Sequence, residues 1–390
     1  MRDGWEIRKL GEITSFVGDG DWIESKDQSP EGIRLIQTGN IGEGTYKDKG
    51  ERAKYISTDT FQRLHCTEIF AGDCLVSRLP DPIGRACILP KLNGRTITAV
   101  DCSIIRFKPT FLPQLFVYYS LSNRYQSYIN TNATGTTRKR ISRKRLEQVP
   151  VHVPTIVEQE KIVAELDCLT GIFGKKKQQL EELDKLAQSI FYDMFGDPIT
   201  NEKGWPVKRL GEIGKVITGN TPTTRDAENY SSNDYCFVKP GDIGKDAVET
   251  IEKTEAHIST KAYMSSRRLP IGSVLTTCIG IVGKVGITGK EATCNQQINA
   301  ILPNDGMSSI YVATAILLCR KVLEVMANAP VVPIINKGDF SSISIPFPPL
   351  DLQNEFAQKI EAIEKQKELV KRSIVETEML FKSRMDYWFK

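Results

Sequence analysis

Gly4–Ile13 read GWEIRKLGEI and Gly204–Ile213 read GWPVKRLGEI, so one ten-residue pattern occurs twice in the 390-residue chain. Three more pairs of blocks follow in the same order: QTGNIG (37–42) with KPGDIG (239–244), IGRACI (83–88) with VGKVGI (282–287), and VPVHVP (149–154) with ISIPFP (343–348). Because four ordered matches are not expected by chance, the sequence is a tandem repeat of one unit of about 195 residues. We expect both copies to adopt the same fold.

The first part of each copy has the composition of a globular α+β domain. It is rich in Gly, Thr and β-branched residues, and short apolar runs between turn residues are typical of strands. We predict strands at Cys74–Val76, Ile104–Phe107 and Ser273–Ile279, and helices at Gln114–Ile129 and Ser309–Ala327. A proline-bearing hinge then leads into a helical stretch in each copy.

The two helical stretches carry a heptad pattern, with apolar residues spaced alternately by four and three positions. Such a pattern, sustained over about five heptads, is typical of helices that pair along a seam. The residues that we expect to pair are Ile162, Leu166, Leu169, Leu180, Leu183 and Ile190 in the first helix, and Phe356, Ile360, Ile363, Val370, Ile374 and Phe381 in the second. Packing of each helix on its own domain alone remains the alternative.

These patterns predict four segments: globular domains at 1–155 and 197–349, and long helices at 156–196 and 350–390. The first globular segment carries 23 basic and 17 acidic residues, and the second carries 16 and 15. The densest basic run is Arg138, Lys139, Arg140, Arg143, Lys144 and Arg145. A solvated charge run is the ordinary interpretation, but TGTT (134–137) precedes this one and offers hydroxyls and backbone N–H groups to phosphates. Nucleic acid is therefore the favoured partner.

Several classes of protein are excluded or disfavoured by what the sequence contains. The nine cysteines form no C-x-x-C pair and the three histidines are scattered, so a metal site or a catalytic triad is not expected. FVGDG (16–20) has the shape of an S-adenosylmethionine loop, but N-P-P-Y and D-P-P-F are both missing, and we interpret it as a turn. The longest apolar run, Tyr311–Cys319, is about half a membrane span. With no apolar leader at the start, we expect a cytoplasmic protein without catalytic residues.

Together, these features resemble the specificity (S) subunit of a type I restriction–modification enzyme. Two variable globular domains, each opening with W-x-x-x-x-L-G-E-I, alternate with two long helices. Each helix follows a proline step, VPTIVEQE (153–160) and PPLDLQNE (348–355), and CNQQI (294–298) also fits the recognition domains of the family. The resemblance covers essentially the whole chain.

The resemblance implies an α+β protein in which two tandem DNA target-recognition domains alternate with two antiparallel coiled-coil helices about a pseudo-twofold axis. Such a subunit reads double-stranded DNA, docks two methyltransferase subunits, and can be joined by two restriction subunits. S-adenosylmethionine, ATP and Mg²⁺ are then expected on the partners and no cofactor on this chain, with no membrane involved. Besides the basic run, the resemblance suggests Arg78, Arg85, Arg267, Arg268, Lys284 and Lys337 as DNA contacts.

Three other functions remain open at this point. A fused methyltransferase would need the missing tetrapeptide, and a purely structural coiled-coil adaptor would not need two basic domains. A stand-alone duplex-binding protein would need no partner subunits. A methylation-only system, in which a reader serves a methyltransferase without restriction, would use the same chain.

Overall fold

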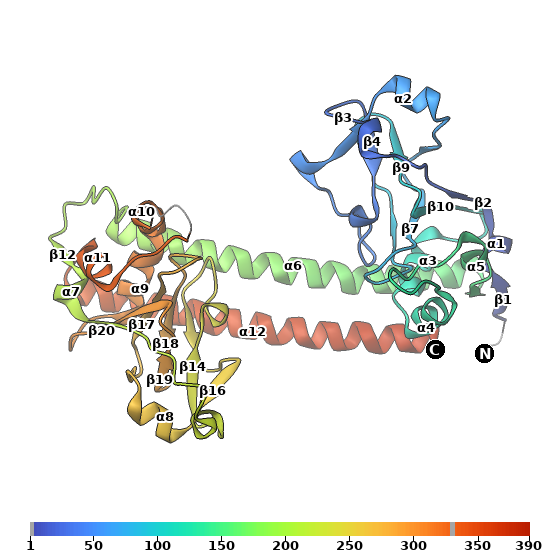
Figure 1. The fold of residues 1–390 in the computed structure, drawn as a ribbon. Helices are drawn as coiled ribbons and strands as arrows, with labels where there is room; N and C mark the ends of the chain where they lie inside the picture. The colour runs from blue at the N-terminus through green and yellow to red at the C-terminus, as the bar shows by residue number, and fades with distance from the viewer. Residues whose placement is uncertain (1–3, 328–331) are drawn as a thin grey trace. The chain divides into compact units, whose positions relative to one another are not determined.

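The structure, a computed structural model, describes residues 4–327 and 332–390. Contacts divide the chain into two units, which are described separately: unit 1 comprises residues 1–176 and 373–390, and unit 2 comprises residues 177–372. Figure 1 shows that each unit holds one globular region of mixed strands and helices together with parts of the two long helices. The long helices are α6 (Ile156–Phe195) and α12 (Leu350–Phe389).

The remaining elements of unit 1 are short. Its strands are β1 (Glu6–Lys9), β2 (Thr14–Asp19), β3 (Gln28–Ser29), β4 (Ile33–Ile36), β5 (Lys54–Ile56), β6 (Glu68–Ile69), β7 (Cys74–Ser77), β8 (Ala86–Ile88), β9 (Thr96–Thr98), β10 (Cys102–Phe107) and β11 (Pro150–Val153). Its helices are α1 (Leu10–Ile13), α2 (Thr58–Arg63), α3 (Pro113–Ser120), α4 (Asn123–Asn132) and α5 (Arg143–Glu147), with 3₁₀ turns η1 (Ser25–Asp27), η2 (Thr38–Asn40) and η3 (Gly50–Arg52).

Unit 2 repeats much of this order. Its strands are β12 (Val207–Arg209), β13 (Gly214–Thr218), β14 (Tyr235–Val238), β15 (Glu249–Ile251), β16 (Ala256–Ile258), β17 (Val274–Thr277), β18 (Val285–Thr288), β19 (Ala292–Cys294), β20 (Ile298–Pro303) and β21 (Ser344–Pro346). Its helices are α7 (Leu210–Ile213), α8 (Thr260–Ser265), α9 (Ser309–Leu318), α10 (Arg320–Met326) and α11 (Lys337–Ser342), with 3₁₀ turns η4 (Ala227–Tyr230) and η5 (Pro240–Asp242).

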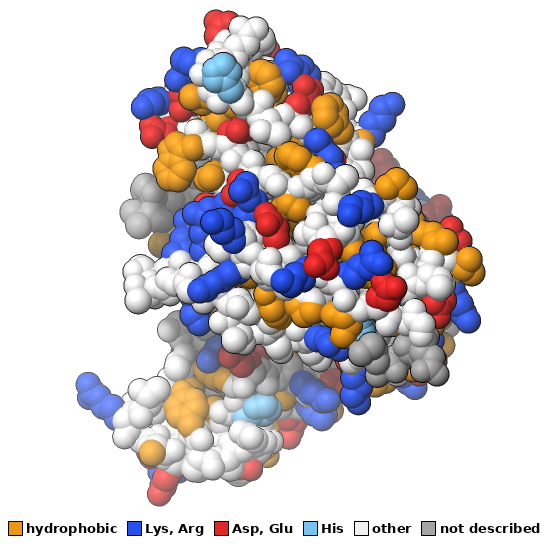
Figure 2. Space-filling model, turned by 90° about the vertical axis from the view of Figure 1, so that its right-hand side faces the viewer, with side chains coloured by type: hydrophobic (Ala, Val, Ile, Leu, Met, Phe, Trp, Pro, Cys, Tyr) orange, Lys and Arg blue, Asp and Glu red, His pale blue; other side chains and the backbone are white. Residues whose placement is uncertain are grey.

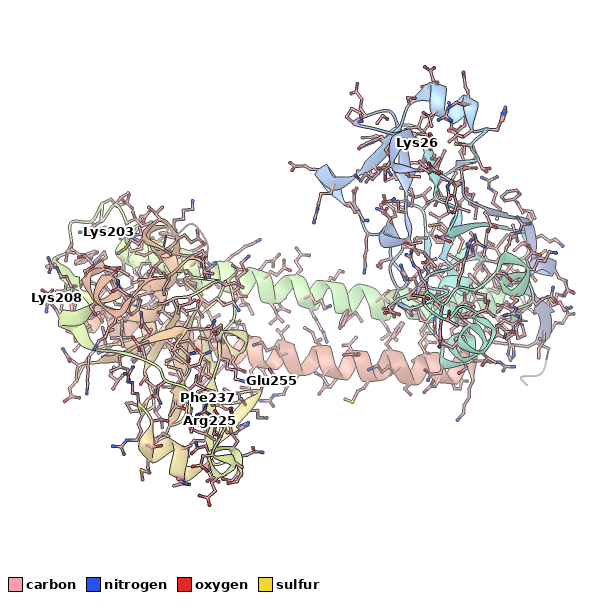
Figure 3. All side chains as sticks on the ribbon, in the orientation of Figure 1. Lys26, Lys203, Lys208, Arg225, Phe237 and Glu255 are labelled. Carbon is pink, nitrogen blue, oxygen red and sulfur yellow. The ribbon has the colours of Figure 1, made fainter. Side chains whose placement is uncertain are left out.

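The sheets confirm that both copies have the same fold. An inner sheet has the order β2-β10-β7-β8 in unit 1 and β13-β20-β17-β18-β15 in unit 2. An outer sheet has the order β3-β5-β4-β9-β6 in unit 1 and β16-β14-β19 in unit 2, and the parallel pair β4–β9 corresponds to β14–β19. Two-stranded sheets, β1-β11 and β12-β21, join the start of each copy to the strand before its long helix. In Figure 3, Lys26 marks the outer part of unit 1, and Arg225 and Phe237 mark that of unit 2.

The predicted strands are confirmed, but each predicted short helix is two helices. In unit 1 the chain leaves α3 at Leu121, and the Ser122 hydroxyl caps α4 by accepting a hydrogen bond from the backbone N–H of Tyr125. In unit 2 the break falls at Cys319, between α9 and α10. FVGDG also differs from the prediction, because Gly18 lies inside strand β2 and not in a turn.

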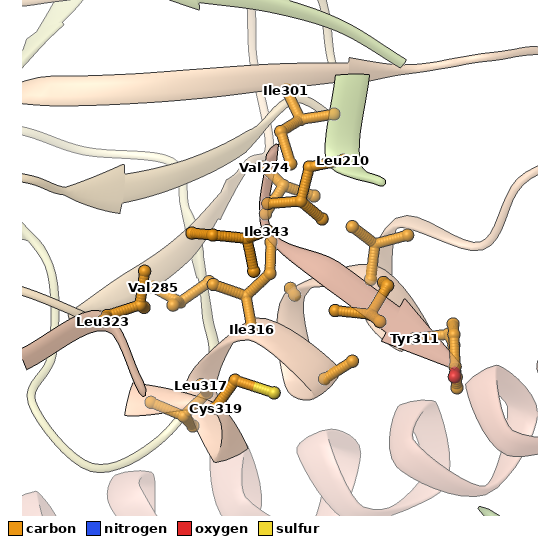
Figure 4. Close-up of a cluster of buried hydrophobic side chains, with 14 of the residues drawn as sticks. Leu210, Val274, Val285, Ile301, Tyr311, Ile316, Leu317, Cys319, Leu323 and Ile343 are labelled. Atoms are coloured by element: carbon orange, nitrogen blue, oxygen red, sulfur yellow. The ribbon is translucent and has the colours of Figure 1, made fainter. Parts of the chain in front are cut away.

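The core of each unit lies between the inner sheet and the helices. In unit 2, Val274, Val285 and Ile301 of the inner sheet pack against Tyr311 and Ile316 of α9 (Figure 4). The same cluster takes in Phe191, Phe195 and Phe356 of the long helices. In unit 1 the corresponding cluster takes in Ile162 and Leu166 of α6, and Met385, Trp388 and Phe389 of α12. The long helices are therefore part of both cores.

Within each unit, α6 and α12 run antiparallel. In unit 1, Arg384 forms an ion pair with Glu165, and Lys176 donates hydrogen bonds to Ser373 and Thr377. In unit 2, Lys367 lies 2.8 Å from Asp184 and 2.6 Å from Glu364. Lys367 is only 3% exposed. Burial alone would lower its pKa, but hydrogen bonds to the two carboxylates raise it instead.

All twelve residues of the predicted seam are at least half-buried. Seven of its residues are buried, namely Ile162, Leu166, Leu169, Leu183, Phe356, Ile360 and Ile363, and the remainder, Leu180, Ile190, Val370, Ile374 and Phe381, are half-buried. The heptad pattern missed Phe191, Phe195, Met385 and Phe389, which are also buried. They extend the apolar face because the helix ends pack on a globular region as well as on each other. No helix in the described ranges is long and apolar enough to cross a membrane.

Phe191→Ala should lower the free energy of unfolding by about 3–5 kcal/mol, because Phe191 is fully buried and its ring packs against Tyr311 and Phe356. Urea denaturation followed by tryptophan fluorescence measures the change. The matched control is the adjacent Tyr192→Ala, which removes a 43% exposed ring and should cost no more than about 1 kcal/mol. Equal losses of unfolding free energy in the two variants would contradict the assignment of Phe191 to the buried face of α6 and of Tyr192 to its exposed face.

Candidate nucleic-acid interface

Four segments of unit 1 meet at one end of its inner sheet. They are the end of β2 (19–21), Arg78 after β7, the β9–β10 turn (99–101) and the segment 134–143, and we call them the unit 1 edge. Backbone hydrogen bonds tie them together: Arg78 N to Asp101 O (2.9 Å), Ile141 N to Arg78 O (3.2 Å) and Asp21 N to Thr98 O (2.8 Å), just before the β9–β10 turn. The edge is therefore built by the backbone, and its side chains are presented on a fixed frame.

Charged side chains of both signs occupy the unit 1 edge. Asp19 lies 3.4 Å from Arg78 and 3.9 Å from Arg143, and Asp101 lies 3.1 Å from Arg140. Arg78 is 4% exposed, and burial lowers the pKa of its guanidinium while Asp19 opposes the shift. Arg78 is thus an internal support of the edge. Arg140 and Arg143 have side chains 39% and 43% exposed and can reach a ligand.

The rest of the predicted basic run is more exposed still. Arg138 and Lys139 lie in the segment that closes on itself through the Thr134–Arg140 bridge, and Lys144 lies on α5. Arg145 donates a hydrogen bond to Asn132 O (2.6 Å), whereas Arg138, Lys139 and Lys144 make no ion pair within residues 4–327 and 332–390. On the face shown in Figure 2, Lys and Arg side chains gather in patches with Asp and Glu among them. Exposed cations of this kind are suited to phosphate oxygens.

Unit 2 has an edge with the same backbone frame. Cys278 N donates to Gln297 O (2.8 Å), Ile335 N to Cys278 O (2.9 Å) and Asn220 N to Cys294 O (2.9 Å). These bonds match those of unit 1 one by one, so that Cys278 takes the place of Arg78 and Gln297 the place of Asp101. The unit 2 edge thus consists of 218–221, Cys278, the β19–β20 turn (295–297) and 333–337.

Uncharged side chains replace most of the charged ones at the unit 2 edge, where Lys337 is the one charged residue. The strand register pairs Ser103 with Asp19 in unit 1 and Asn299 with Thr218 in unit 2. In unit 1 the Ser103 hydroxyl donates to Asp19 (3.1 Å), and in unit 2 the Thr218 hydroxyl donates to the Asn299 amide oxygen (2.6 Å). Both copies therefore have a side-chain hydrogen bond between these two strands, but the acceptor is a carboxylate in unit 1 and an amide oxygen in unit 2.

The structure corrects the DNA-contact prediction for Arg85. Its side chain is 7% exposed and donates to four backbone carbonyls, those of Thr38 (2.8 Å), Ile41 (2.6 Å), Leu79 (2.9 Å) and Pro82 (2.8 Å). Burial lowers the pKa of the guanidinium. Arg85 is therefore a clamp on the 3₁₀ turn η2 and not a surface contact.

Lys284 is corrected in the same way. Its ammonium group donates to Pro240 O and Ile243 O, both at 2.9 Å, and so holds η5 as Arg85 holds η2. Gly84 and Gly283, which precede the two cations, have φ of +81° and +82°, a conformation that favours glycine. This explains two of the repeated sequence blocks. QTGNIG and KPGDIG contain the turns η2 and η5, and IGRACI and VGKVGI contain the cations that hold these turns.

The three remaining candidates of unit 2 are exposed. Arg267 donates through Nη1 to Thr218 O (2.6 Å) and through its backbone N–H to the Asn220 side chain (2.9 Å), which places it beside the unit 2 edge. Arg268 Nη1 lies 3.9 Å from the sulfur of Met264. Lys337 begins α11, which is capped by Asn336, at the position that Arg143 holds in unit 1. Asp101 and Thr221 lay outside every sequence pattern, whereas Asp19 and Gln296 lay in FVGDG and CNQQI without a role assigned to either residue; the alignment of the two backbone frames brings all four forward.

The comparison with protein families decides the identity. The family model described as the type I restriction modification DNA specificity domain matches residues 2–185 and again residues 202–379, once in each copy. The chain belongs to this family. It is a non-catalytic DNA specificity subunit, as the sequence motifs predicted.

Relatives of the specificity subunit come from distant organisms. The HindI specificity subunit of Haemophilus influenzae is 30% identical over 164 residues, 41% of this chain and 36% of the relative. The putative MjaX specificity subunit of Methanocaldococcus jannaschii is 22% identical over 392 residues, 93% of this chain and 87% of the relative. This chain thus spans about a third of the first relative but most of the second.

Solved structures share the fold of this specificity subunit. One, from work on complex assembly and conformational transition of the type I R-M system, has a TM-score of 0.62 at 18% identity and covers 100% of this chain and 98% of that chain. A type I S subunit from M. genitalium has a TM-score of 0.56 at 14% identity and covers 98% and 95%. The expected tandem α+β architecture is therefore confirmed.

Arg85→Met should lower the free energy of unfolding by about 2–4 kcal/mol, because it leaves buried carbonyls without donors. Arg85→Lys should recover about half of the loss, since Lys284 serves two carbonyls in unit 2. The control Arg138→Met, at an exposed position, should stay within about 0.5 kcal/mol of the wild type. Chemical denaturation measures all three, and a wild-type stability for Arg85→Met would refute the clamp.

Proposed function

We propose that the chain reads a split, asymmetric duplex DNA target, one half-site per copy, within a type I restriction–modification complex. The observation that carries the proposal is the pair of edges: one backbone frame, built twice, with different side chains. Two identical edges would suit a palindrome, whereas different edges suit two different half-sites. Exposed cations beside each edge supply phosphate contacts, and the polar groups of the edge supply base contacts.

In this proposal two methyltransferase subunits dock on the chain, and two restriction subunits can join them. The support is membership of the specificity family, together with apolar side chains that α12 exposes to solvent. Leu369, Val375 and Met379 are 61%, 54% and 58% exposed, more than a helix packed on all sides would show. S-adenosylmethionine, ATP and Mg²⁺ bind to the partners in this proposal. The complex acts in the cytoplasm, where its DNA is found.

The decisive experiment expresses the chain with its methyltransferase in a host that lacks adenine methylation, and maps modified bases across the genome. A single motif of two unlike halves with an unread gap is expected. The chain alone and the methyltransferase alone are the controls, and neither should modify the genome. A palindromic or continuous motif would contradict the proposal. Tight, selective binding by the chain alone, with no methyltransferase recovered on it, would favour the stand-alone binder.

Changing Arg138, Lys139 and Lys144 together to Gln should weaken binding to all duplexes alike. The slope of log affinity against log salt should fall by roughly one for each phosphate that the variant no longer neutralises. Fluorescence anisotropy of the assembled complex at several salt concentrations measures both quantities. The charge-matched control changes Lys203, Lys208 and Lys365, which are also exposed, and should leave the slope unaltered. A changed methylation motif in the first variant would mean that the run reads bases.

A further inference from the structure

Three consecutive amide side chains occupy the β19–β20 turn of the unit 2 edge. Asn295 donates through Nδ2 to Gln297 Oε1 (2.9 Å), and Gln297 N donates to Asn295 Oδ1 (3.1 Å). Between them, Gln296 is exposed, and its Oε1 accepts a hydrogen bond from the Thr221 hydroxyl (2.5 Å). An exposed glutamine is ordinarily free to sample many rotamers, but this one is held by a neighbouring segment.

A glutamine held in this way is prepared to bind. Fixing its side chain before binding removes part of the entropy cost that a flexible glutamine would incur on contact. The bond from Thr221 uses one lone pair of Oε1 and leaves the other lone pair and both N–H groups of Nε2. One acceptor and one donor, side by side, match the N6 amino group and N7 of adenine in the major groove.

The internal repeat indicates that this arrangement serves specificity and not the fold. The backbone positions of Asn295, Gln296 and Gln297 correspond to Ala99, Val100 and Asp101 in unit 1. Trp22, which is 68% exposed, stands where unit 2 has Thr221. The hydrogen-bonded pair of unit 2, Thr221 and Gln296, is therefore replaced at both positions in unit 1, by Trp22 and Val100.

Exposed cations near the β19–β20 turn are suited to hold DNA against it. Lys337 lies on the same edge and Arg267 lies beside it, both exposed, so phosphates held by them bring the groove to the turn. Resting on the proposed function, we propose that Gln296 reads an adenine of the half-site bound by unit 2. Thr221 acts as its positioning residue.

The test uses the full complex and a panel of duplexes in which each base pair of the wild-type motif is replaced in turn. Relative affinities are measured for Gln296→Val, for Thr221→Val and for Thr221→Ser. Gln296→Val should lose discrimination at one A·T pair of one half-site, by roughly 5- to 150-fold. Thr221→Val should lose part of it, and Thr221→Ser, which keeps the hydroxyl, should restore it. The other half-site and the gap should not change.

Lys337→Gln is the control on the same edge, and it should weaken binding equally across the panel. If Gln296→Val weakens binding equally for all duplexes, Gln296 is a positioning group and the proposal is overturned. An unchanged set of relative affinities, or a loss of discrimination at a G·C pair, would also overturn it. Equal discrimination in Thr221→Val and the wild type would overturn the role of Thr221. Failure of the wild-type complex to recognise any split motif would instead refute the proposed function, so the two failures are distinguishable.

Discussion

The pairing of α6 with α12 is the interaction on which both globular regions depend. Each unit takes its core in part from both helices: unit 1 uses Trp388 and Phe389, and unit 2 uses Phe191 and Phe195. The first copy is therefore completed by the last residues of the chain, and neither copy is a closed fold as the repeat divides it. Lys367, which is buried, opposes sliding of the helices, since a shifted register would separate it from Asp184 of α6 and leave it with only Glu364 of its own helix.

Outside these cores, each copy uses backbone hydrogen bonds to hold its frame, and the side chains carried on the frame differ between the copies. Arg85 and Lys284 hold the turns η2 and η5 through backbone carbonyls, which are present whatever the side chains of the turn. A clamp that binds only backbone tolerates sequence change around it. The edges use the same logic, because their segments are joined by backbone hydrogen bonds and their side chains are free to differ. A family of DNA readers needs this combination.

Much of the architecture was predictable because it depends on periodicity. The heptad spacing located the long helices, and repeated blocks showed two copies of one fold. Phe191 and Phe195 were missed because a strict seam assumes one partner helix, whereas the helix ends also face a globular region. Arg85 was misassigned for a different reason: a cation after a glycine in a loop has the same sequence whether it faces phosphates or carbonyls. Burial decides between them, and burial depends on distant turns.

The two edges also show how affinity and selectivity can change independently. At the positions of Asp19, Arg78, Asp101, Arg140 and Arg143, unit 1 has three cations and two anions, and the equivalents in unit 2 have a single cation, Lys337. Asp21, Arg138 and Lys139 also belong to the unit 1 edge, so that its net charge is +2, and the net charge of the unit 2 edge is +1. Because attraction to the phosphate backbone depends mainly on charge, both edges, which are positive, can attract duplex DNA. Because base recognition depends on the placement of donors and acceptors, the two edges proposed above as base readers would select different bases. One duplicated fold can therefore keep a positive edge in each copy while the donors and acceptors of the two edges differ.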